Sequence, residues 1–346
     1  MKSLMTYREA LASGMAKEMD VDPRVFVFGL DVPDHKRIFG STKGLVEKFG
    51  PERCFGTPLS EDAMTGVAIG AALSGLRPVH VHIRADFLLL GMNQIANVMS
   101  SLRYTSGGAL NIPLVIRAII GRGWGQGAQH SKSLHGVFAH FPGIKVVLPT
   151  TPQDAYGILR AAIRDDNPVI ILEHRWLYDI EGEVDDEAGM SLSGPAILRK
   201  GDAVTVVCTS WMNLEALKAA DVLVKRGIEL EVIDIRTVTP LDERLVVDSV
   251  NRTGRCIVAD YDWLFCGFSA ELAARLSHQC FETLQLPVER IGFAPVPCPT
   301  TRPLENLFYP SAVDIIRTVE RMLKLPHADL SGETFYSYEQ RFKGPF

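Results

Sequence analysis

The residues best suited to chemistry are an acidic pair and an aromatic ring, separated by a helix and a strand. Glu61 and Asp62 follow Ser60, and together these three residues are typical of a helix start, where a serine cap and acidic side chains are favoured. Phe87 lies just beyond the next predicted strand. A buried carboxyl group and an aromatic ring placed in this way suit a flat heteroaromatic ligand that must be both protonated and stacked.

The helix that begins after Ser60 is expected to be buried and to allow a close approach on one side. Its apolar residues recur at helical spacing. Its small residues, Gly66, Gly70 and Ser74, leave another face of the helix without bulky side chains. Gly75 provides the stop signal. Residues 78–83 then alternate like a strand that leads to Phe87.

Three histidines follow a glycine-rich loop, GRGWGQG at 121–127. A histidine between such a loop and a helix can donate to a carboxylate or to a developing oxyanion, which makes His130 and His140 candidates. His135 has no motif and is assigned a structural role. The spacing does not suit a zinc site, and no acid or cysteine completes one.

The same loop offers a weaker alternative. GWGQGA, taken from Gly123, matches the dinucleotide-binding pattern G-x-G-x-x-A after a strand. That pattern needs an acid about 20 residues later, but the region at 146–149 reads VVLP. The dinucleotide interpretation is therefore the less favoured one.

Composition excludes several classes of protein. The chain has 346 residues, 47% of them hydrophobic, which predicts about two domains with full cores. No apolar run reaches the roughly 18 residues that cross a bilayer, and the N-terminus lacks a signal-peptide core, so we expect no membrane partner. A net charge of -5 with interspersed signs argues against nucleic acid. The six cysteines show no metal spacing and indicate reduced core thiols in a cytoplasmic protein.

Strands and helices alternate along most of the chain, which predicts an α/β fold with two domains, each a mainly parallel sheet flanked by helices. The first domain is expected at 1–180 and includes a helix that begins after Thr6 and another that begins after Thr151. The acidic segment EGEVDDEAG places a linker at 181–200. The second domain is expected at 201–325. The polar tail at 326–346 is expected to lie over a partner subunit or to be disordered.

Several motifs resemble one family. TPLSEDAMTG, RADF, GQGAQHSKSLHGVFAHFPGIKVVLPTTPQDA and AIRDDNPVIILE resemble the β subunit of the thiamine-diphosphate-dependent E1 component of 2-oxoacid dehydrogenase complexes, in the transketolase-like superfamily. The resemblance runs from about residue 7 to residue 325. It implies a pyrimidine-binding domain followed by a transketolase C-terminal-like domain.

The resemblance also assigns roles to residues. Glu61 matches the glutamate that hydrogen-bonds the cofactor pyrimidine and drives its tautomerisation, and Leu59 and Phe87 match cofactor-binding positions. His130 and His140 match catalytic positions. Alone, Glu61 would more often be a surface acid at a helix start, Phe87 a core residue, and each histidine structural.

A potassium site is also implied. The segment AIRDDN resembles one that binds a structural potassium ion through backbone carbonyls, at positions matching Leu114, Ala162, Ile163, Asp165 and Asn167. Oxygen ligands suit such a hard cation. The equally weighted alternative is an ordinary helix end followed by an Asn-Pro turn.

The resemblance implies partners as well. No Gly-Asp-Gly…Asn-Asn motif for magnesium and diphosphate is present, and in the two-chain form of the family that motif belongs to the α subunit. We therefore expect an α2β2 assembly in which the α subunit holds Mg2+. The substrate would be a 2-oxo acid and the acyl acceptor a lipoyl-bearing E2 protein.

Two positions depart from the family pattern. Leu30 stands where an acid usually follows the first strand, and Arg84 replaces an apolar or aromatic residue. They support an alternative, a two-subunit thiamine-dependent carboligase with a non-lipoyl acceptor such as an aldehyde. Arg84 would reach an anionic substrate or pair with an acid. A further alternative, a non-catalytic scaffold for an α chain, is disfavoured by the retained Glu61, Phe87, His130 and His140.

Overall fold

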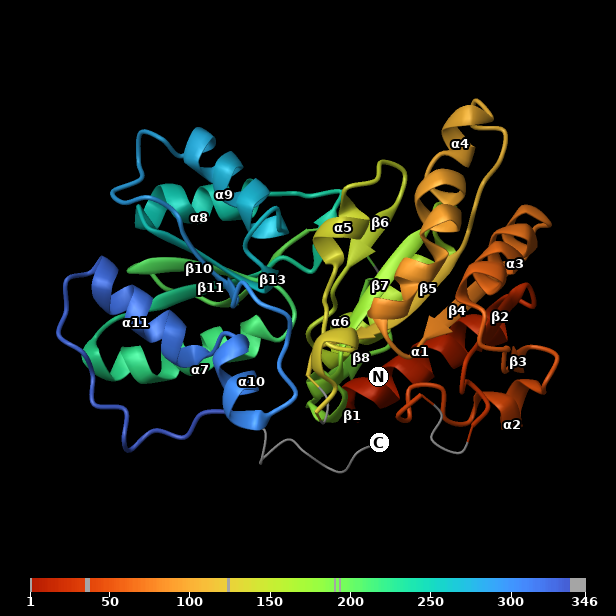
Figure 1. The fold of residues 1–346 in the computed structure, drawn as a ribbon, viewed down its shortest axis with the longest axis horizontal. Helices are drawn as coiled ribbons and strands as arrows, with labels where there is room; N and C mark the ends of the chain where they lie inside the picture. Colours follow the sequence, from red (N-terminus) through yellow and green to blue (C-terminus); the bar gives the residue numbers. More distant parts are fainter. Residues whose placement is uncertain (1, 35–37, 123–124, 190, 193, 337–346) are drawn as a thin grey trace.

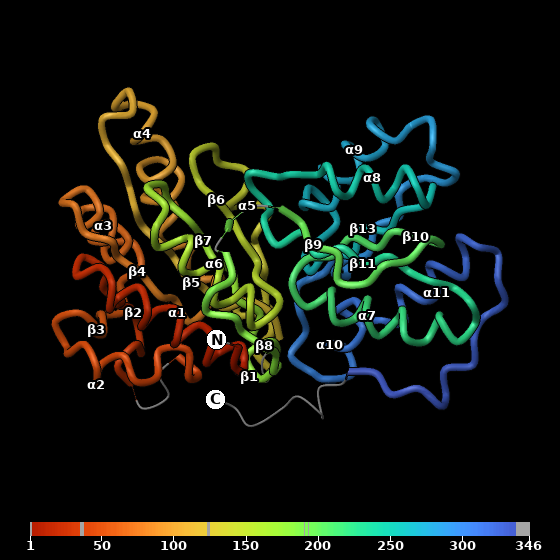
Figure 2. Tube along the Cα trace, turned by 180° about the vertical axis from the view of Figure 1, so that it is seen from behind, coloured from red at the N-terminus to blue at the C-terminus, as the bar shows by residue number. Residues whose placement is uncertain are grey.

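The computed structural model describes residues 2–34, 38–122, 125–189, 191–192 and 194–336. Two lobes, each built on its own sheet, lie side by side (Figure 1). The reverse view shows the same arrangement, with the N-terminal half of the chain in one lobe and most of the C-terminal half in the other (Figure 2). No helix of the described residues is both long and apolar enough to cross a membrane.

The first lobe contains a seven-stranded sheet. Its strands are, in spatial order, β12 (Thr237–Thr239), β6 (Lys145–Val147), β7 (Val169–His174), β5 (Val115–Ile120), β4 (Arg77–His82), β2 (Val25–Gly29) and β3 (Cys54–Phe55). All neighbours pair in parallel except the edge pair β12 and β6. The helices of this lobe are α1 (Tyr7–Val21), α2 (Leu45–Phe49), α3 (Glu61–Leu73), α4 (Leu102–Thr105), α5 (His135–Ala139) and α6 (Pro152–Arg164).

Capping residues determine where two long helices begin, α1 and α6, which pack against each other. Thr6 and Glu9 form a reciprocal capping box at the start of α1. Thr151 and Asp154 form another at the start of α6, where Pro152 takes the first helical position. Both starts were predicted, because these caps satisfy backbone N–H groups that the helix itself leaves free.

The second lobe contains a five-stranded sheet. Its order is β14 (Glu289–Phe293), β13 (Cys256–Trp263), β10 (Val204–Cys208), β11 (Leu230–Asp234) and β9 (Ala196–Arg199), and only β9 is antiparallel. Helices α8 (Arg244–Thr253) and α9 (Phe268–Gln279) cover one face, and α7 (Met212–Leu223) and α11 (Ala312–Met322) cover the other (Figure 1). Helix α10 (Arg302–Phe308), which the sequence did not suggest, lies near the first lobe.

The two sheets confirm the α/β prediction, but the segments outside the expected domains are more ordered than predicted. The expected linker contains two strands: β8 (Glu181–Asp185) pairs with β1 (Lys2–Thr6), and β9 joins the second sheet. Strand β12 crosses from the second half of the chain into the first sheet. Residues 326–336 of the expected tail pack on their own chain, since Tyr336 lies edge-on to Trp211 and Glu333 pairs with Lys225. Residues 337–346 lie outside the described part.

The segment after Phe87 also differs from its prediction. A helix was expected from 92 to 104. The chain instead forms a 3-10 helix (Ala85–Gly91), a π-helix (Asn93–Met99) and the short helix α4. The amide of Ser100 accordingly donates to the carbonyl of Ile95, five residues earlier (3.1 Å). Apolar periodicity does not distinguish a π-helix from an α-helix over so short a stretch.

Candidate functional site

A cavity of about 590 Å³ lies where strands β2 and β4 end, beside the start of α3. Ligands of open α/β sheets bind at this edge, outside the carboxyl ends of the strands. Six residues singled out from the sequence line the cavity together, and five of them are Leu30, Leu59, Glu61, Phe87 and His130. Arg84 lines it as well. The structure thus brings one site together from segments up to about a hundred residues apart in the sequence.

Glu61 is the first residue of α3, and its side chain is partly buried at the cavity wall. The side chain of Ser60 makes no capping hydrogen bond, contrary to the expected cap. The free N–H groups of a helix start favour a negative charge or an acceptor there. Asp62, the neighbouring acid, is exposed and does not line the cavity.

A tight contact fixes Phe87 relative to Glu61. Phe87 lies on the 3-10 helix Ala85–Gly91, which packs on α3. A side chain at Gly91 would approach the hydroxyl of Thr65 to 3.1 Å and the carbonyl of Glu61 to 3.5 Å. The hydroxyl of Thr65 in turn donates to that carbonyl (2.7 Å). Glu61 and Phe87 are therefore held on one rigid corner of the cavity.

His130 comes from the glycine-rich loop. It follows the 3-10 turn Gly127–Gln129, and the hydroxyl of Ser131 closes this turn by donating to the carbonyl of Gly127 (2.6 Å). Gly127 has φ +61, and a side chain on it would collide with Thr300 of the second lobe at 2.5 Å. The second lobe therefore braces the loop that carries His130. Gly123 and Trp124, which begin the dinucleotide-like pattern, lie outside the described residues.

The sequence analysis missed two histidines, His80 and His82, which share one face of β4 and line the cavity. His80 stacks on Phe28 (centroids 4.6 Å apart, planes 7° apart), and the rings of the two histidines meet at 3.2 Å between Nδ1 of His80 and Nε2 of His82. Burial lowers the pKa of His80 well below its usual value and that of His82 to about 4. Both imidazoles are therefore neutral near pH 7. The alternation HVH in the strand was the available signal.

Arg84 pairs with no acid in the part of the chain that the structure describes. Its side chain is buried, and its Nη1 donates to the carbonyl of Gly121 (2.7 Å), while Nη2 donates to the amide oxygen of Gln126. Nε is buried without a hydrogen-bond partner among the described residues. Burial lowers the pKa of Arg84 to about 10, so the guanidinium remains charged at neutral pH.

The other two histidines lie elsewhere. His140 is exposed at the end of α5, edge-on to Phe141, and the structure does not bring it to the cavity. His135 is fully buried between the lobes, where its Nε2 lies 2.9 Å from the carboxylate of Asp260 on β13. That position agrees with the structural role predicted for His135.

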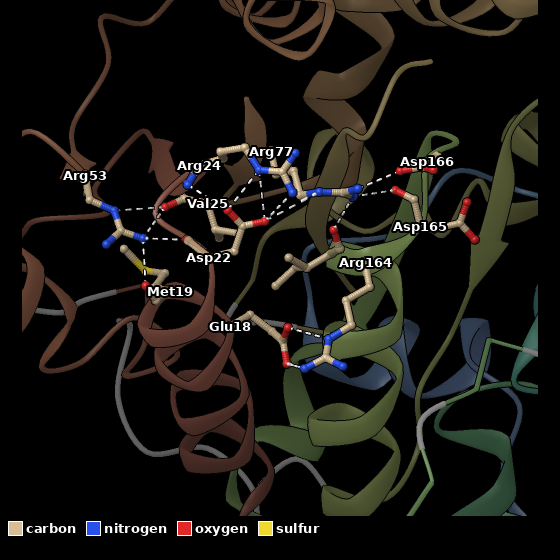
Figure 3. A network of polar contacts seen from close by, with 11 residues as sticks. Glu18, Met19, Asp22, Arg24, Val25, Arg53, Arg77, Arg164, Asp165 and Asp166 are labelled. Atoms are coloured by element: carbon tan, nitrogen blue, oxygen red, sulfur yellow. Dashed lines mark hydrogen bonds and ion pairs between the residues drawn. The ribbon is translucent and has the colours of Figure 1, made fainter. Parts of the chain in front are cut away.

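The segment compared with a potassium site forms the end of α6 and the turn after it (Figure 3). The carbonyls of Ile163 and Asp165 accept from the guanidinium of Arg77 (2.9 and 3.1 Å). The carboxylate of Asp165 pairs with Lys145 and accepts from the amide of Asn167. The side chains are thus engaged within the protein, whereas each carbonyl oxygen keeps a second lone pair.

Two further positions of the proposed ion site, Leu114 before β5 and Ala162 in α6, are also main-chain acceptors. The carbonyl of Leu114 accepts from the amide of Val169 (2.9 Å), and that of Ala162 accepts from the amide of Asp165 (3.2 Å). Such carbonyl oxygens are suitable ligands for a hard monovalent cation. Within the described residues no group of three or more His, Cys, Asp or Glu side chains is arranged to hold a metal ion.

Two family models match this chain. Residues 3–180 match the family "Transketolase, pyrimidine binding domain", and residues 195–315 match "Transketolase, C-terminal domain". In fold, the chain is similar to a solved "Split gene transketolase, inactive beta4 tetramer" (TM-score 0.75, 23% identity, 93% of this chain and 99% of that one).

Relatives with higher identity are subunits of one class of enzyme. "Pyruvate dehydrogenase E1 component subunit beta-2, mitochondrial" of Oryza sativa is 40% identical over 92% of this chain and 86% of its own. "Acetoin:2,6-dichlorophenolindophenol oxidoreductase subunit beta" of Cupriavidus necator is 39% identical (92% and 98%). "2-oxoisovalerate dehydrogenase subunit beta" of Bacillus subtilis is 37% identical (93% and 99%). The chain therefore belongs to the transketolase-like family of E1 β subunits.

Proposed function

We propose that this chain is the β subunit of an E1-type enzyme, which uses thiamine diphosphate to decarboxylate a 2-oxo acid and passes the acyl group to a lipoyl domain of an E2 protein. The observation that carries the proposal is that Glu61 and Phe87 lie on the wall of one cavity, on elements packed against each other. Family membership supports the same function, because the relatives are named as subunits of such enzymes.

The residues around the cavity fit the cofactor's aminopyrimidine. Glu61 supplies a carboxyl group for a ring nitrogen, and Phe87 supplies an aromatic face, with Leu59 beside them. Thiamine diphosphate, when bound, supplies a nucleophilic carbon and an electron sink for the pair left behind when carbon dioxide departs. Glu61 shares a proton with the ring nitrogen. His130 donates a hydrogen bond to the carboxylate or to the developing oxyanion of the substrate.

The neutral pair His80 and His82 has a supporting role in this proposal. Because both rings are uncharged near pH 7, they add no positive charge beside Glu61 and leave its proton sharing undisturbed. Stacking on Phe28 fixes the ring of His80. This wall of the cavity is therefore rigid before any ligand binds, which reduces the ordering cost of binding.

An incomplete surface supports a partner chain. Leu59 just before α3 is 74% exposed, Val67 on α3 is 54% exposed, and Leu73 and Leu76 at its end are also exposed. Several large apolar side chains exposed along one segment are typical of a protein interface. We infer that the α subunit covers it in an α2β2 assembly and holds Mg2+ and the diphosphate. The helix is thus less buried in the single chain than the sequence suggested.

Two finer assignments follow from the same proposal. A potassium ion held by the carbonyls of Leu114, Ala162, Ile163, Asp165 and Asn167 would brace the end of α6. Five of the six cysteines are buried, and none of the six forms a disulfide, which suits a reducing compartment, and we place the protein in the cytoplasm.

Replacement of Glu61 tests the proposed function. In the α–β complex loaded with thiamine diphosphate and Mg2+, E61Q should abolish decarboxylation of 2-oxo acids while leaving the assembly intact by size-exclusion chromatography. D62N is the matched control, because Asp62 is the adjacent acid but lies outside the cavity wall. Near-normal turnover by E61Q would overturn the proposal.

The acceptor is tested separately, because Leu30 lines the cavity where the family usually has an acid. Transfer to an isolated lipoyl domain supports the dehydrogenase, whereas product formation only with aldehydes supports the carboligase. Calorimetry of the complex with thiamine diphosphate addresses the scaffold alternative, which predicts no binding.

A further inference from the structure

Arg84 differs from the other buried arginines of the described residues. Arg117 pairs with Glu173 through two bonds of 2.6 and 3.0 Å, Arg122 pairs with Glu305 at 2.9 Å, and Arg160 pairs with Glu18 at 2.8 Å. Arg84 is only 3% exposed, yet its hydrogen-bond partners are two neutral groups, the carbonyl of Gly121 and the amide of Gln126.

Among the described residues no nearby acid forms an ion pair with Arg84, although the charge of Asp86 favours the charged guanidinium. Asp86 follows it closely in sequence but pairs with Lys132 (3.0 Å). Asp31, Asp34 and Glu61 line the same cavity, and among the described residues none of them forms an ion pair with the guanidinium. Removing a charge from water costs several kcal/mol, which a paired counter-charge offsets. An unpaired buried cation on a cavity wall therefore indicates an anion supplied by a ligand.

We propose that Arg84 is the counter-ion of an anionic group on the substrate side chain, so that the cavity selects 2-oxo acids with a second, distal carboxylate. This inference rests on the proposed function and names its substrate class. Gly121 and Gln126 orient the guanidinium, and the neutral rings of His80 and His82 in the same cavity add no second positive charge.

The anion held by Arg84 is a group that the reaction retains. When the carboxylate next to the carbonyl departs as carbon dioxide, its negative charge moves onto the carbon skeleton. A cation bound to that carboxylate would stabilise the ground state more than the transition state and would slow the reaction. A distal carboxylate keeps its charge throughout, so its contact with Arg84 contributes equally in both states and lowers KM.

The test compares substrates of equal length in the α–β complex loaded with thiamine diphosphate. 2-Oxoglutarate and 2-oxopentanoate differ only in a terminal carboxylate against a methyl group, and 2-oxoadipate and 2-oxohexanoate form a longer pair. We expect wild-type kcat/KM to favour the dicarboxylate at least tenfold in one pair. R84M should lose that preference mainly through KM, and R84K should retain part of it.

A second variant guards against misfolding. Q126E leaves Arg84 in place but gives it a carboxylate within reach, so it should also lose the preference for the dicarboxylate. R244M is the control, because Arg244 is an exposed arginine on α8, and its substrate ratio should match wild type.

The outcomes separate the inference from the function on which it rests. A wild-type preference for the methyl-ended acids, or an R84M variant with an unchanged substrate ratio, overturns the inference alone. If R84M instead binds thiamine diphosphate more weakly and its substrate ratio is unchanged, the inference is also overturned, because Arg84 then binds the cofactor and not the substrate. A complex that binds thiamine diphosphate but decarboxylates none of the four acids contradicts the proposed function.

Discussion

The imidazole of His130 stands edge-on to the ring of Phe87, with centroids 5.2 Å apart and planes at 75°. The glycine-rich loop therefore touches the residue proposed to stack on the cofactor. An aromatic ring has a negative face and a positive edge, so perpendicular pairs of this kind are favourable. The contact links a proposed cofactor-binding residue to a proposed proton donor.

Replacing Phe87 should weaken cofactor binding. F87L keeps an apolar side chain but removes the aromatic face, and ring contacts contribute about 0.5–1.5 kcal/mol beyond burial. The affinity of the α–β complex for thiamine diphosphate should fall by roughly 2- to 13-fold on this basis, as measured by calorimetry. Y104L, at an exposed tyrosine of α4, should bind normally. Equal affinity of F87L and wild type would remove Phe87 from the cofactor site.

The buried pair of Arg117 and Glu173 should dominate the stability of the first sheet. The two side chains join β5 to β7 and are nearly inaccessible to solvent, and the hydroxyl of Tyr178 also donates to Glu173 (2.6 Å). E173Q leaves a buried guanidinium without its counter-charge, which should cost about 3–5 kcal/mol of unfolding free energy.

Urea unfolding measures this cost. The matched control is E183Q, which breaks an exposed pair with Lys2 (67% and 71% exposed side chains) and should cost at most about 1 kcal/mol. Similar losses of unfolding free energy in E173Q and E183Q would show that the buried pair stabilises the protein no more than the exposed pair does.

The sequence predicted the parts of the fold that local chemistry determines. The caps of Thr6 and Thr151 identified α1 and α6, and the alternation at 78–83 identified β4. Long-range pairings were missed. Strand β8 was expected to be a linker because its acidic residues show no apolar alternation, yet it is ordered by pairing with β1.

The candidate site was predictable where a motif carries the chemistry. Glu61, Phe87 and His130 were found in this way, and the structure places them around one cavity. His80 and His82 were missed because alternation in a strand does not tell a core face from a cavity wall. His140 has a matching motif but lies on the surface. Its exposure could not be predicted, because a motif does not indicate in which direction the residue at the end of a short helix points.

A charge on the exposed face of α3 should prevent assembly. Val67 on α3 is 54% exposed, so V67E should leave the isolated chain folded but block its association with the α subunit. Size-exclusion chromatography with light scattering measures the mass of the complex. V224E, at another partly exposed valine in the second lobe, is the control. A V67E complex of normal mass and affinity would exclude α3 from the interface.

His135 should make the contact between the lobes sensitive to alkaline pH. It starts α5 in the first lobe, and its ring lies between Asp260 (2.9 Å) and Asp262 (3.7 Å) of β13 in the second. Burial opposes its charge, but the nearby Asp260, through its charge and hydrogen bond, and Asp262 raise the pKa of His135 to about 9. The hydroxyl of Thr209 and the amide of Ser269 donate to Asp260 and hold its carboxylate in place.

The sign of the effect follows from linkage. A group whose pKa is higher in the folded state stabilises the fold below its unfolded pKa, near 6.5 for histidine, and loses that contribution as pH rises to about 9. The unfolding free energy of wild type minus that of H135Q should therefore be largest below pH 6.5. It should fall by up to about 1.4 kcal/mol per pH unit between pH 7 and 9.

Urea titrations at several pH values measure this difference, and D260N provides the matched variant from the other side of the contact. D260N removes the charge that holds the proton on His135, so its own stability should vary less than that of wild type between pH 7 and 9. Burial raises the pKa of Asp262 to about 6, so its titration lies below this window and does not mimic the effect. A difference between wild type and H135Q that stays constant from pH 6 to 9.5 would mean that His135 is neutral in the folded protein. The lobes would then be held together by packing and neutral hydrogen bonds at this point.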